Sequence, residues 1–465
     1  MRPDWLISLT IATPFLASAD EPVPAAETPA PPPSYKILRF DEDYACLANP
    51  ALRGDGLDPL KYIPLWTNGL ATYLTVGGEL RERFEAAKDP GFGVQGDHDA
   101  YWLQRITLLG DLHVGDRLRF YVEGISGLEE GEAQPAPPPQ NDPLDLQFAF
   151  VDVVPYLTGD ESLTVRAGRF GMSLGSGRLV ATRAAPNIPF KFDGAELLYV
   201  NPGWTWTAFL TRPVLEAPNQ LSNADSGTAF WGIYGTHWLD PAQQLGYDLY
   251  YLGIEREHGD YASGTGRELR HSFGSRLFGE RNHWDWNAEA VAQTGTYGDE
   301  SILAWTASLD AGYTLKTDWE PRFGLKADVA SGNTGDGRQG TFDALYFKSG
   351  YFNDASLLRP ENIIDLHPNV GFAPARSVSV DGGVDVFWRY SRNDGIYSPA
   401  GFLELPASNH RSAYVGTALD VNLEWRIQKH ISLLASYVHF ATGDYIQAAR
   451  GGQVDYVSTT LSFIF

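Results

Sequence analysis

Apolar and polar residues alternate along most of the chain, in segments of about ten residues that are separated by polar or glycine-rich connections. In the segment 73–84, Leu80 and Phe84 fall on one face. Arg81 and Arg83 fall on the opposite face, because successive side chains of a β-strand point to opposite sides. A soluble sandwich buries its apolar face, whereas a membrane barrel turns that face to lipid and encloses the polar one. The alternation therefore predicts strands but is compatible with both architectures.

The lengths of the connections favour the membrane barrel. We expect eighteen strands, at 73–84, 101–112, 117–126, 146–154, 162–169, 195–201, 204–212, 229–238, 244–254, 268–278, 284–294, 302–313, 321–331, 369–374, 378–391, 413–427, 430–441 and 453–465. Even-numbered strands are followed by short turns such as HVGD, and odd-numbered strands by longer loops, at 170–194, 255–267, 332–368 and 392–412. An even strand count with short turns on one side is typical of outer-membrane barrels. We predict an all-β, transmembrane antiparallel β-barrel with short periplasmic turns and long extracellular loops.

The last predicted strand supports the same architecture. Val457, Leu461 and Phe463 share one of its faces, and the given sequence ends at Phe465. An exposed apolar edge strand invites aggregation, whereas closure into a barrel removes the edge. A final Phe on an amphipathic strand also resembles the signal that the bacterial barrel-assembly machinery recognises. That machinery and outer-membrane lipid are therefore expected partners.

The first residues have the order of a secretory signal, with a positive charge at Arg2, an apolar stretch at 5–16 and small residues at 17–19. The residues that follow are rich in proline and predict an extended, unpacked linker. The expected organisation is a signal peptide at 1–19, a Pro-rich linker at 20–39, a periplasmic segment at 40–72 and an outer-membrane β-barrel at 73–465. A periplasmic secretion partner could dock on the segment that precedes the barrel.

Composition narrows the possible chemistry. The net charge of −23 disfavours nucleic-acid partners, which bind through Lys and Arg. The only cysteine is Cys46, so no intramolecular disulfide forms. The histidines show no metal-ligand spacing, so we expect neither a metal nor another cofactor. Asp89, Asp97 and Asp99 offer oxygen ligands for Ca²⁺, but a solvated acidic loop is the preferred interpretation.

Several motifs resemble the alginate export family of outer-membrane proteins, which is related to the bacterial alginate secretion porin. They are GGELRERFE at 77–85, VRAGRFGMSLGSGRLV at 165–180, PNIPFKFDGAELLY at 186–199 and GLKADVASG at 324–332. The resemblance implies an 18-stranded barrel and passive export of an anionic polysaccharide through an arginine-rich constriction. It also implies that arginines of the first strands and of 165–170, including Arg169, belong to that constriction.

The strand phases place many charged side chains on the inward faces. Candidate pathway residues are Arg81, Arg83, Arg105, Arg119, Arg166, Arg169, Arg270, Arg276, Arg389, Arg426, Asp152 and Glu123. Guanidinium groups pair bidentately with carboxylates, and rings of arginine select anions in pores. Inward charges of opposite sign also pair with one another and hold a barrel in shape, which is the structural alternative for each residue.

The loop 170–194 is long and basic, and we expect it to act as a lid or constriction. Its candidate constriction residues are Arg178, Arg183, Lys191 and Asp193. The leading hypothesis is a porin-like channel for passive export of an alginate-like polysaccharide. The alternatives are an uptake porin for small anionic solutes, a structural barrel with a blocked lumen, and an outer-membrane enzyme. An enzyme would need a nucleophile and a base, for which His271 and Ser272 are the nearest candidates. Adjacent strand residues point to opposite faces, so these two cannot form a catalytic dyad directly.

Overall fold

The computed structural model describes residues 32–66, 70–93, 98–132, 139–240, 244–407 and 412–465. The expected signal peptide and most of the Pro-rich linker lie outside these residues, as does Asp97. Asp89 and Asp99, the other two carboxylates considered for Ca²⁺, are described. Asp99 lies in strand β3 (His98–Val114), and Asp89 follows strand β2 (Thr72–Lys88).

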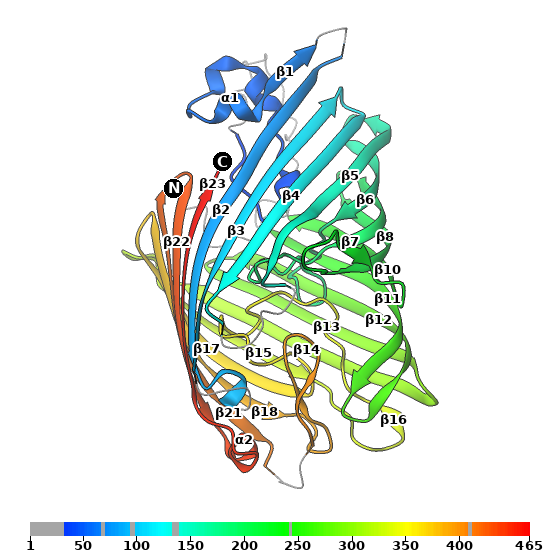
Figure 1. The fold of residues 1–465 in the computed structure, drawn as a ribbon, viewed down its shortest axis with the longest axis vertical. Helices are drawn as coiled ribbons and strands as arrows, with labels where there is room; N and C mark the ends of the chain where they lie inside the picture. The colour runs from blue at the N-terminus through cyan, green and yellow to red at the C-terminus, as the bar shows by residue number, and fades with distance from the viewer. Residues whose placement is uncertain (1–31, 67–69, 94–97, 133–138, 241–243, 408–411) are drawn as a thin grey trace.

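Within the described residues, eighteen long antiparallel strands form a closed barrel (Figure 1). After β2 and β3 these are β4 (Leu118–Glu130), β5 (Asp142–Thr158), β6 (Glu161–Phe170), β7 (Phe192–Val200), β8 (Trp204–Leu215), β10 (Thr228–Asp240), β11 (Leu245–Tyr261), β12 (Gly264–Arg281), β13 (Trp284–Tyr297), β14 (Glu300–Thr314), β15 (Arg322–Ala330), β17 (Ile363–Ala375), β18 (Val378–Arg389), β21 (Tyr414–Gln428), β22 (Ile431–Thr442) and β23 (Val454–Ile464). Each strand pairs with its sequence neighbour, and β2 pairs with β23 from Glu79↔Ile464 to Lys88↔Asp455. The predicted 18-stranded barrel is confirmed.

The remaining elements are short. They are the strands β1 (Ile63–Trp66), β9 (Asn223–Ala224), β16 (Arg338–Gln339), β19 (Ile396–Tyr397) and β20 (Leu403–Leu405), the helices α1 (Asp58–Lys61) and α2 (Asp444–Ala448), and 3-10 turns at Arg39–Asp41, Ala45–Ala48, Pro50–Leu52 and Pro90–Gly93. In the described part of the chain, no helix is both long and apolar enough to cross a membrane.

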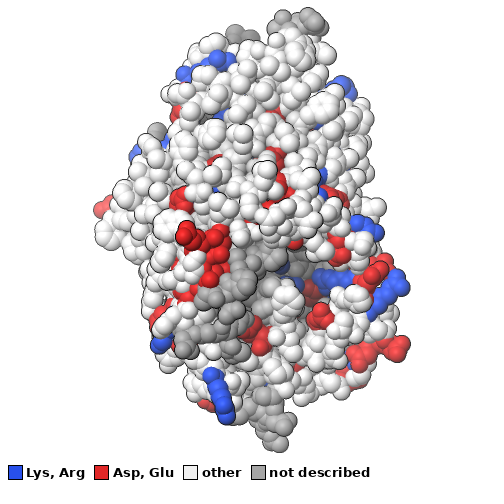
Figure 2. All heavy atoms as spheres, in the orientation of Figure 1, with Lys and Arg blue, Asp and Glu red and all other residues white. Residues whose placement is uncertain are grey.

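The distribution of side chains across the wall distinguishes a membrane barrel from a soluble sandwich. Outward residues are apolar and exposed; Leu108, Leu210 and Phe323 expose 61%, 65% and 56% of their surface. Inward residues are polar and buried, including Arg270 and Asp248, both at 0% exposure. Figure 2 shows one face whose upper part carries few charged side chains, while charged residues gather in its lower part. This inside-out arrangement suits a wall that faces lipid.

Turn lengths follow the predicted alternation with two corrections. Short turns such as Gly115–Arg117, where Gly115 has a φ of +60°, lie at one end of the barrel together with α1 (Figure 1). The expected loop 255–267 is wrong, because β11 and β12 continue through it as a hairpin that turns at residues 262–263. Strand β17 begins at Ile363 rather than near 369, so the loop before it, predicted at 332–368, is shorter and spans 331–362. The segment 255–267 is rich in charged residues and glycine, and Pro368 interrupts the strand that begins at Ile363, so neither segment resembled a strand in the sequence.

Candidate functional site: the loop-filled lumen

Two long loops, 171–191 and 331–362, fold into the barrel and join there. Val180 and Tyr346 form a parallel β-bridge. The amide of Ala181 donates to the Tyr346 carbonyl at 2.8 Å, and the amide of Tyr346 donates to the Leu179 carbonyl at 2.8 Å. The bridge makes the two loops one connected body, which we call the lumen loops.

Arginines on the inner wall hold the first lumen loop. The Arg81 guanidinium donates to the Ala184 carbonyl at 2.8 Å, and that of Arg105 donates to the Ala184 and Pro186 carbonyls at 2.6 and 2.7 Å. Asn187, which is fully buried, donates to the carbonyls of Gln104 and two other residues. The guanidinium groups of these arginines therefore donate hydrogen bonds to the loop rather than to a passing solute.

The second lumen loop is held by charge pairs. Arg256 on β11 lies 2.5 Å from Asp343, and Arg359 lies 3.0 Å from the same carboxylate. Although burial raises the pKa of Asp343, these neighbouring guanidiniums lower it below its ordinary value. Arg183 from the first loop donates to the Phe347 carbonyl at 3.0 Å, and burial lowers its pKa to about 9.

Most other inward arginines pair with carboxylates of the wall. The pairs and their shortest N–O distances are Arg83–Glu85 at 2.5 Å, Arg119–Asp111 at 2.7 Å, Arg166–Asp152 at 2.8 Å, Arg270–Glu268 at 2.6 Å and Arg276–Asp248 at 2.7 Å. Glu123 accepts a hydrogen bond from the Tyr121 hydroxyl at 2.6 Å. These contacts are the structural alternative that the sequence left open, because each charge already has a partner.

Arg169 and Asp193 lie outside the lumen. Arg166 and Phe170 are inward residues of β6, and Arg169 is an odd number of positions from Arg166, so it points outward. It pairs there with Asp193 at 2.7 Å and donates to the Ser222 carbonyl. Because both side chains point outward, the expectation that Arg169 and Asp193 belong to a constriction in the lumen is wrong.

Three further candidates lie near the ends of the wall. Lys191 is fully buried between Asp145 at 2.7 Å and Glu216 at 3.1 Å. Arg389 donates to the Ser412 carbonyl at 2.7 Å, so it holds the loop between β18 and β21. The Arg426 side chain is 46% exposed and pairs with Glu424, near the end of β21. In these contacts, none of the three cations is directed toward the centre of the lumen.

A cavity of about 480 Å³ remains between the lumen loops and the wall. Three cations line it: Arg178, Lys326 and Lys348. Arg178 lies 3.1 Å from Glu289 and 2.5 Å from Asp328, and Lys326 donates to the Tyr351 carbonyl at 2.6 Å. The cavity is also lined by carboxylates farther round the wall, on β18 and β21, at Asp381 and Asp420.

Lys348 differs from the other two cations of the cavity. Its amide donates to the Gly177 carbonyl at 2.8 Å, which fixes its backbone against the first lumen loop. Among the described residues, its ammonium has no hydrogen-bond or ion-pair partner. Burial, with the nearby Lys326 and Arg178, lowers the pKa of this ammonium from 10.5 to about 8. Lys348 is therefore a charged donor that is available to a solute in the cavity.

The segment 34–61 fills part of the lumen at the short-turn end. Phe40 is 4% exposed and packs edge-on against Phe148 and Phe150, with ring centroids 5.5 and 5.1 Å apart. Arg119 donates to the Phe40 carbonyl at 2.7 Å. Arg39 donates to the Phe465 carbonyl at 3.1 Å, so the segment also contacts the end of β23. The predicted segment before the barrel is thus docked inside it.

Sequence reasoning missed Lys348, because it lies in an irregular loop and no periodicity marks it. The rejection of a His271–Ser272 dyad agrees with the structure. The His271 ring lies 2.9 Å from the Tyr251 hydroxyl, whereas the Ser272 hydroxyl accepts from buried Gln293.

Comparison with known proteins adds a family to this geometry. The family model described as alginate export matches residues 72–459. The chain belongs to the alginate export family. The match covers β2 through most of β23, so this family assignment applies to the whole barrel. No match was found among proteins of curated function.

Solved structures share the fold of this alginate export family member. OccK8 (OprE) of Pseudomonas aeruginosa is 12% identical with a TM-score of 0.57, and a BenF-like porin from Pseudomonas fluorescens Pf-5 is 10% identical with a TM-score of 0.58. OpdK of Pseudomonas aeruginosa, solved with vanillate, is 10% identical with a TM-score of 0.56. Each similarity covers 84% of this chain and 98% of the other. Family and fold together indicate a channel of the bacterial outer membrane.

Proposed function

We propose that this family member is a channel for small organic anions that carry a carboxylate. The observation that carries the proposal is the ammonium of Lys348, which lines the cavity with no partner among the described residues. Arg178 and Lys326 line the same cavity, but both lie close to carboxylates, so Lys348 is the cation there that a solute can pair with. A carboxylate entering the cavity gains a charge-assisted hydrogen bond that this ammonium otherwise lacks.

The size of the free space favours a small solute over a polymer. A cavity of about 480 Å³ falls within the range of small-molecule sites, roughly 300–1,000 Å³. A polysaccharide needs a continuous passage along the barrel axis, and the joined lumen loops occupy that space. The segment 34–61 narrows the short-turn end as well.

Export of an alginate-like polysaccharide is the second candidate, and membership of the alginate export family favours it. It requires the lumen loops to leave the barrel, which breaks the contacts of Arg81 and Arg105 with Ala184. A small carboxylate that uses the cavity between the loops and the wall leaves those two contacts in place. OpdK, which shares the fold, was solved with vanillate, itself a small carboxylate.

Swelling of proteoliposomes in iso-osmotic solutes tests the proposal. We expect faster swelling in a small monocarboxylate than in a neutral sugar of similar size, and no swelling in an oligouronate. Lys348→Gln should remove the preference for the carboxylate. Lys316→Gln is the matched control, because Lys316 is exposed in the turn between β14 and β15. Equal rates for the two solutes in the wild type, or rapid permeation of the oligouronate, would contradict the proposal.

A further inference from the structure

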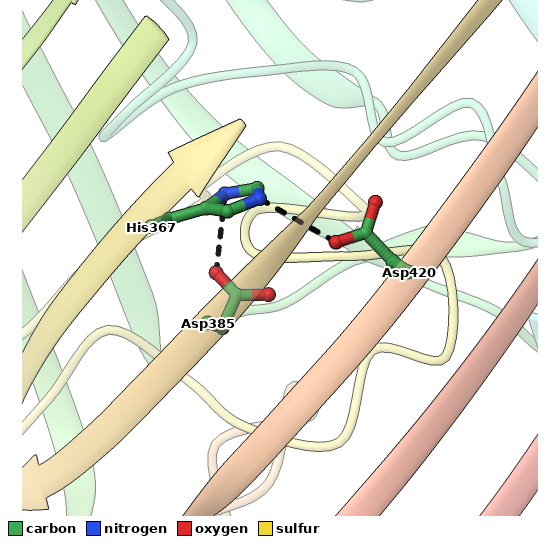
Figure 3. Close-up of side chains that lie close together, drawn as sticks. All are labelled: His367, Asp385 and Asp420. Carbon is green, nitrogen blue, oxygen red and sulfur yellow. Dashed lines mark ion pairs between the residues drawn. The ribbon is translucent and has the colours of Figure 1, made fainter. Parts of the chain in front are cut away.

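Three buried side chains from neighbouring strands converge on the inner wall, on β17, β18 and β21 (Figure 3). The His367 Nδ1 atom lies 3.2 Å from Asp385 Oδ1, and its Nε2 atom lies 3.4 Å from Asp420 Oδ1. One nitrogen of the imidazole and one oxygen of each carboxylate all lie within 4.8 Å of one another. Exposure is 9% for His367, 0% for Asp385 and 3% for Asp420.

The facing atoms of this cluster lack hydrogen bonds. His367 Nε2, Asp385 Oδ1 and Asp420 Oδ1 are buried, and none has a hydrogen-bond partner among the described residues. A buried polar atom without a partner is costly, so three that lie this close together indicate a missing ligand or proton.

A fourth side chain adds an independent observation. Asp365 lies two positions before His367 on β17, so both side chains point to the same side of the wall. It is 1% exposed, and neither of its carboxylate oxygens has a hydrogen-bond partner within the described chain. Its cross-strand partner, Phe387, is two positions from Asp385. The cluster therefore gathers three buried carboxyl groups around one imidazole.

We propose that His367, Asp385 and Asp420 bind a divalent first-row transition-metal ion, with the carboxyl group of Asp365 beside it. Imidazole and carboxylate ligands suit Zn²⁺ and its neighbours, whereas Mg²⁺ and Ca²⁺ prefer oxygen alone. Ligands held about 2.0–2.2 Å from such an ion lie roughly 3 to 4.4 Å apart, close to the spacing of these atoms. This site lies on the wall of the cavity that Lys348 also lines, but the proposal does not depend on the passage of carboxylates.

The surroundings of the cluster give the ion access and a structural role. His367 and Asp420 line the 480 Å³ cavity, so an ion reaches them from the lumen. Asn353 of the second lumen loop donates to Asp385 Oδ2 at 3.2 Å. A bound ion would thus fix Asp385 in place and strengthen the attachment of that loop to β18.

The second acidic group of similar spacing does not offer the same site. Asp142, Asp145 and Glu216 also lie close together. The ammonium of Lys191 lies 2.7 Å from Asp145 and 3.1 Å from Glu216, so a cation already occupies that group.

Titration of the purified full-length barrel in detergent with Zn²⁺ alone tests the proposal, read by calorimetry. We expect one ion per barrel, with affinity at least about tenfold weaker in His367→Gln and Asp420→Asn. Co²⁺ substitution should give an absorption band that requires His367. The matched control is His439→Gln, because His439 also lies against a carboxylate, 2.8 Å from Asp455, but on a partly exposed surface.

Heat-modifiable migration on gels shows whether each variant is folded. If His367→Gln does not fold, Asp365→Asn replaces it, since the side chain of Asp365 has no hydrogen-bond partner within the described chain, and its binding should be weaker than that of the wild type. A wild type that binds no Zn²⁺, or binds it as tightly as His367→Gln does, would overturn the proposal. The cluster would then be a protonated imidazole between two carboxylates.

Discussion

Arg81 donates a hydrogen bond of 2.8 Å to the carbonyl of Ala184 and so ties the inner wall of β2 to the first lumen loop. Arg105 on β3 donates to the same carbonyl at 2.6 Å. Because the two lumen loops are joined at Val180 and Tyr346, these contacts on one side of the barrel also restrain the loop that arises on the other. The loops, more than the wall, therefore determine the width of the passage through the lumen.

Replacing both anchors should loosen the first lumen loop. A hydrogen bond to a charged group contributes about 1.5–3 kcal/mol, so Arg81→Ala with Arg105→Ala removes a large share of the loop's attachment. We expect larger and noisier single-channel conductance in planar bilayers. Arg426→Ala is the control, because that side chain is 46% exposed. Unchanged conductance in the double variant would show that other contacts hold the loop.

Anion selectivity should depend on pH through Lys348. Its pKa is lowered to about 8, so the ammonium is charged below that pH and neutral above it. The reversal potential in a salt gradient should therefore indicate weaker anion selectivity as pH rises from 7 to 9. Lys348→Gln should have weak selectivity throughout and lose this step. If the anion selectivity of Lys348→Gln falls by the same amount over this pH range, a group other than Lys348 titrates.

The fold could be predicted almost completely from the sequence, because a barrel wall repeats one local rule. Each strand alternates apolar and polar residues, and lipid outside and polar groups inside keep that rule intact over eighteen strands. The rule failed at 255–267, which is rich in charged residues and glycine, and before 369, where Pro368 interrupts the strand. Neither error altered the strand order.

Phe40 should act as the anchor of the segment 34–61. Replacing a buried Phe with Ala costs about 3–5 kcal/mol, and this ring packs against Phe148 and Phe150 inside the barrel. We expect Phe40→Ala to make the segment sensitive to limited proteolysis while the barrel stays folded. Ile37→Ala is the control, because Ile37 is 68% exposed. Equal protection of both variants would show that the contacts of Arg39 suffice.

The pair Arg166–Asp152 should stabilise the barrel rather than select anions. The guanidinium contacts both carboxylate oxygens, at 2.8 and 2.9 Å, and both residues are buried. Leaving one partner of a buried pair unpaired costs about 3–5 kcal/mol. Arg166→Ala should therefore lower the free energy of unfolding in urea.

Two comparisons isolate the pairing of these charges. Arg166→Met combined with Asp152→Asn should recover part of the loss, because the Asp152 charge is then removed with its partner, whereas Glu196, 3.7 Å from Arg166, loses that contact in both variants. Arg338→Ala, which removes one member of an exposed pair with Asp336, should change stability by at most about 1 kcal/mol. If the double variant is as unstable as Arg166→Ala, the loss of stability comes from packing rather than from an unpaired charge.

The candidate site was harder to predict than the wall, for a physical reason. Strand periodicity gives the face on which Arg81 or Arg166 lies, but not its partner. The contacts of Arg81 with Ala184, and of Lys348 with the cavity, depend on where irregular loops fold. The His367 cluster draws one residue from each of three strands, so no linear spacing signals it.

The central claim, that the channel passes small carboxylates, is tested most directly by the bi-ionic reversal potential of the wild-type protein in a planar bilayer. Chloride is placed on one side and a small monocarboxylate on the other, and an oligouronate is then substituted for the monocarboxylate. We expect the monocarboxylate to carry current about as readily as chloride and the oligouronate to carry none. Current carried by the oligouronate would contradict the account and support polysaccharide export.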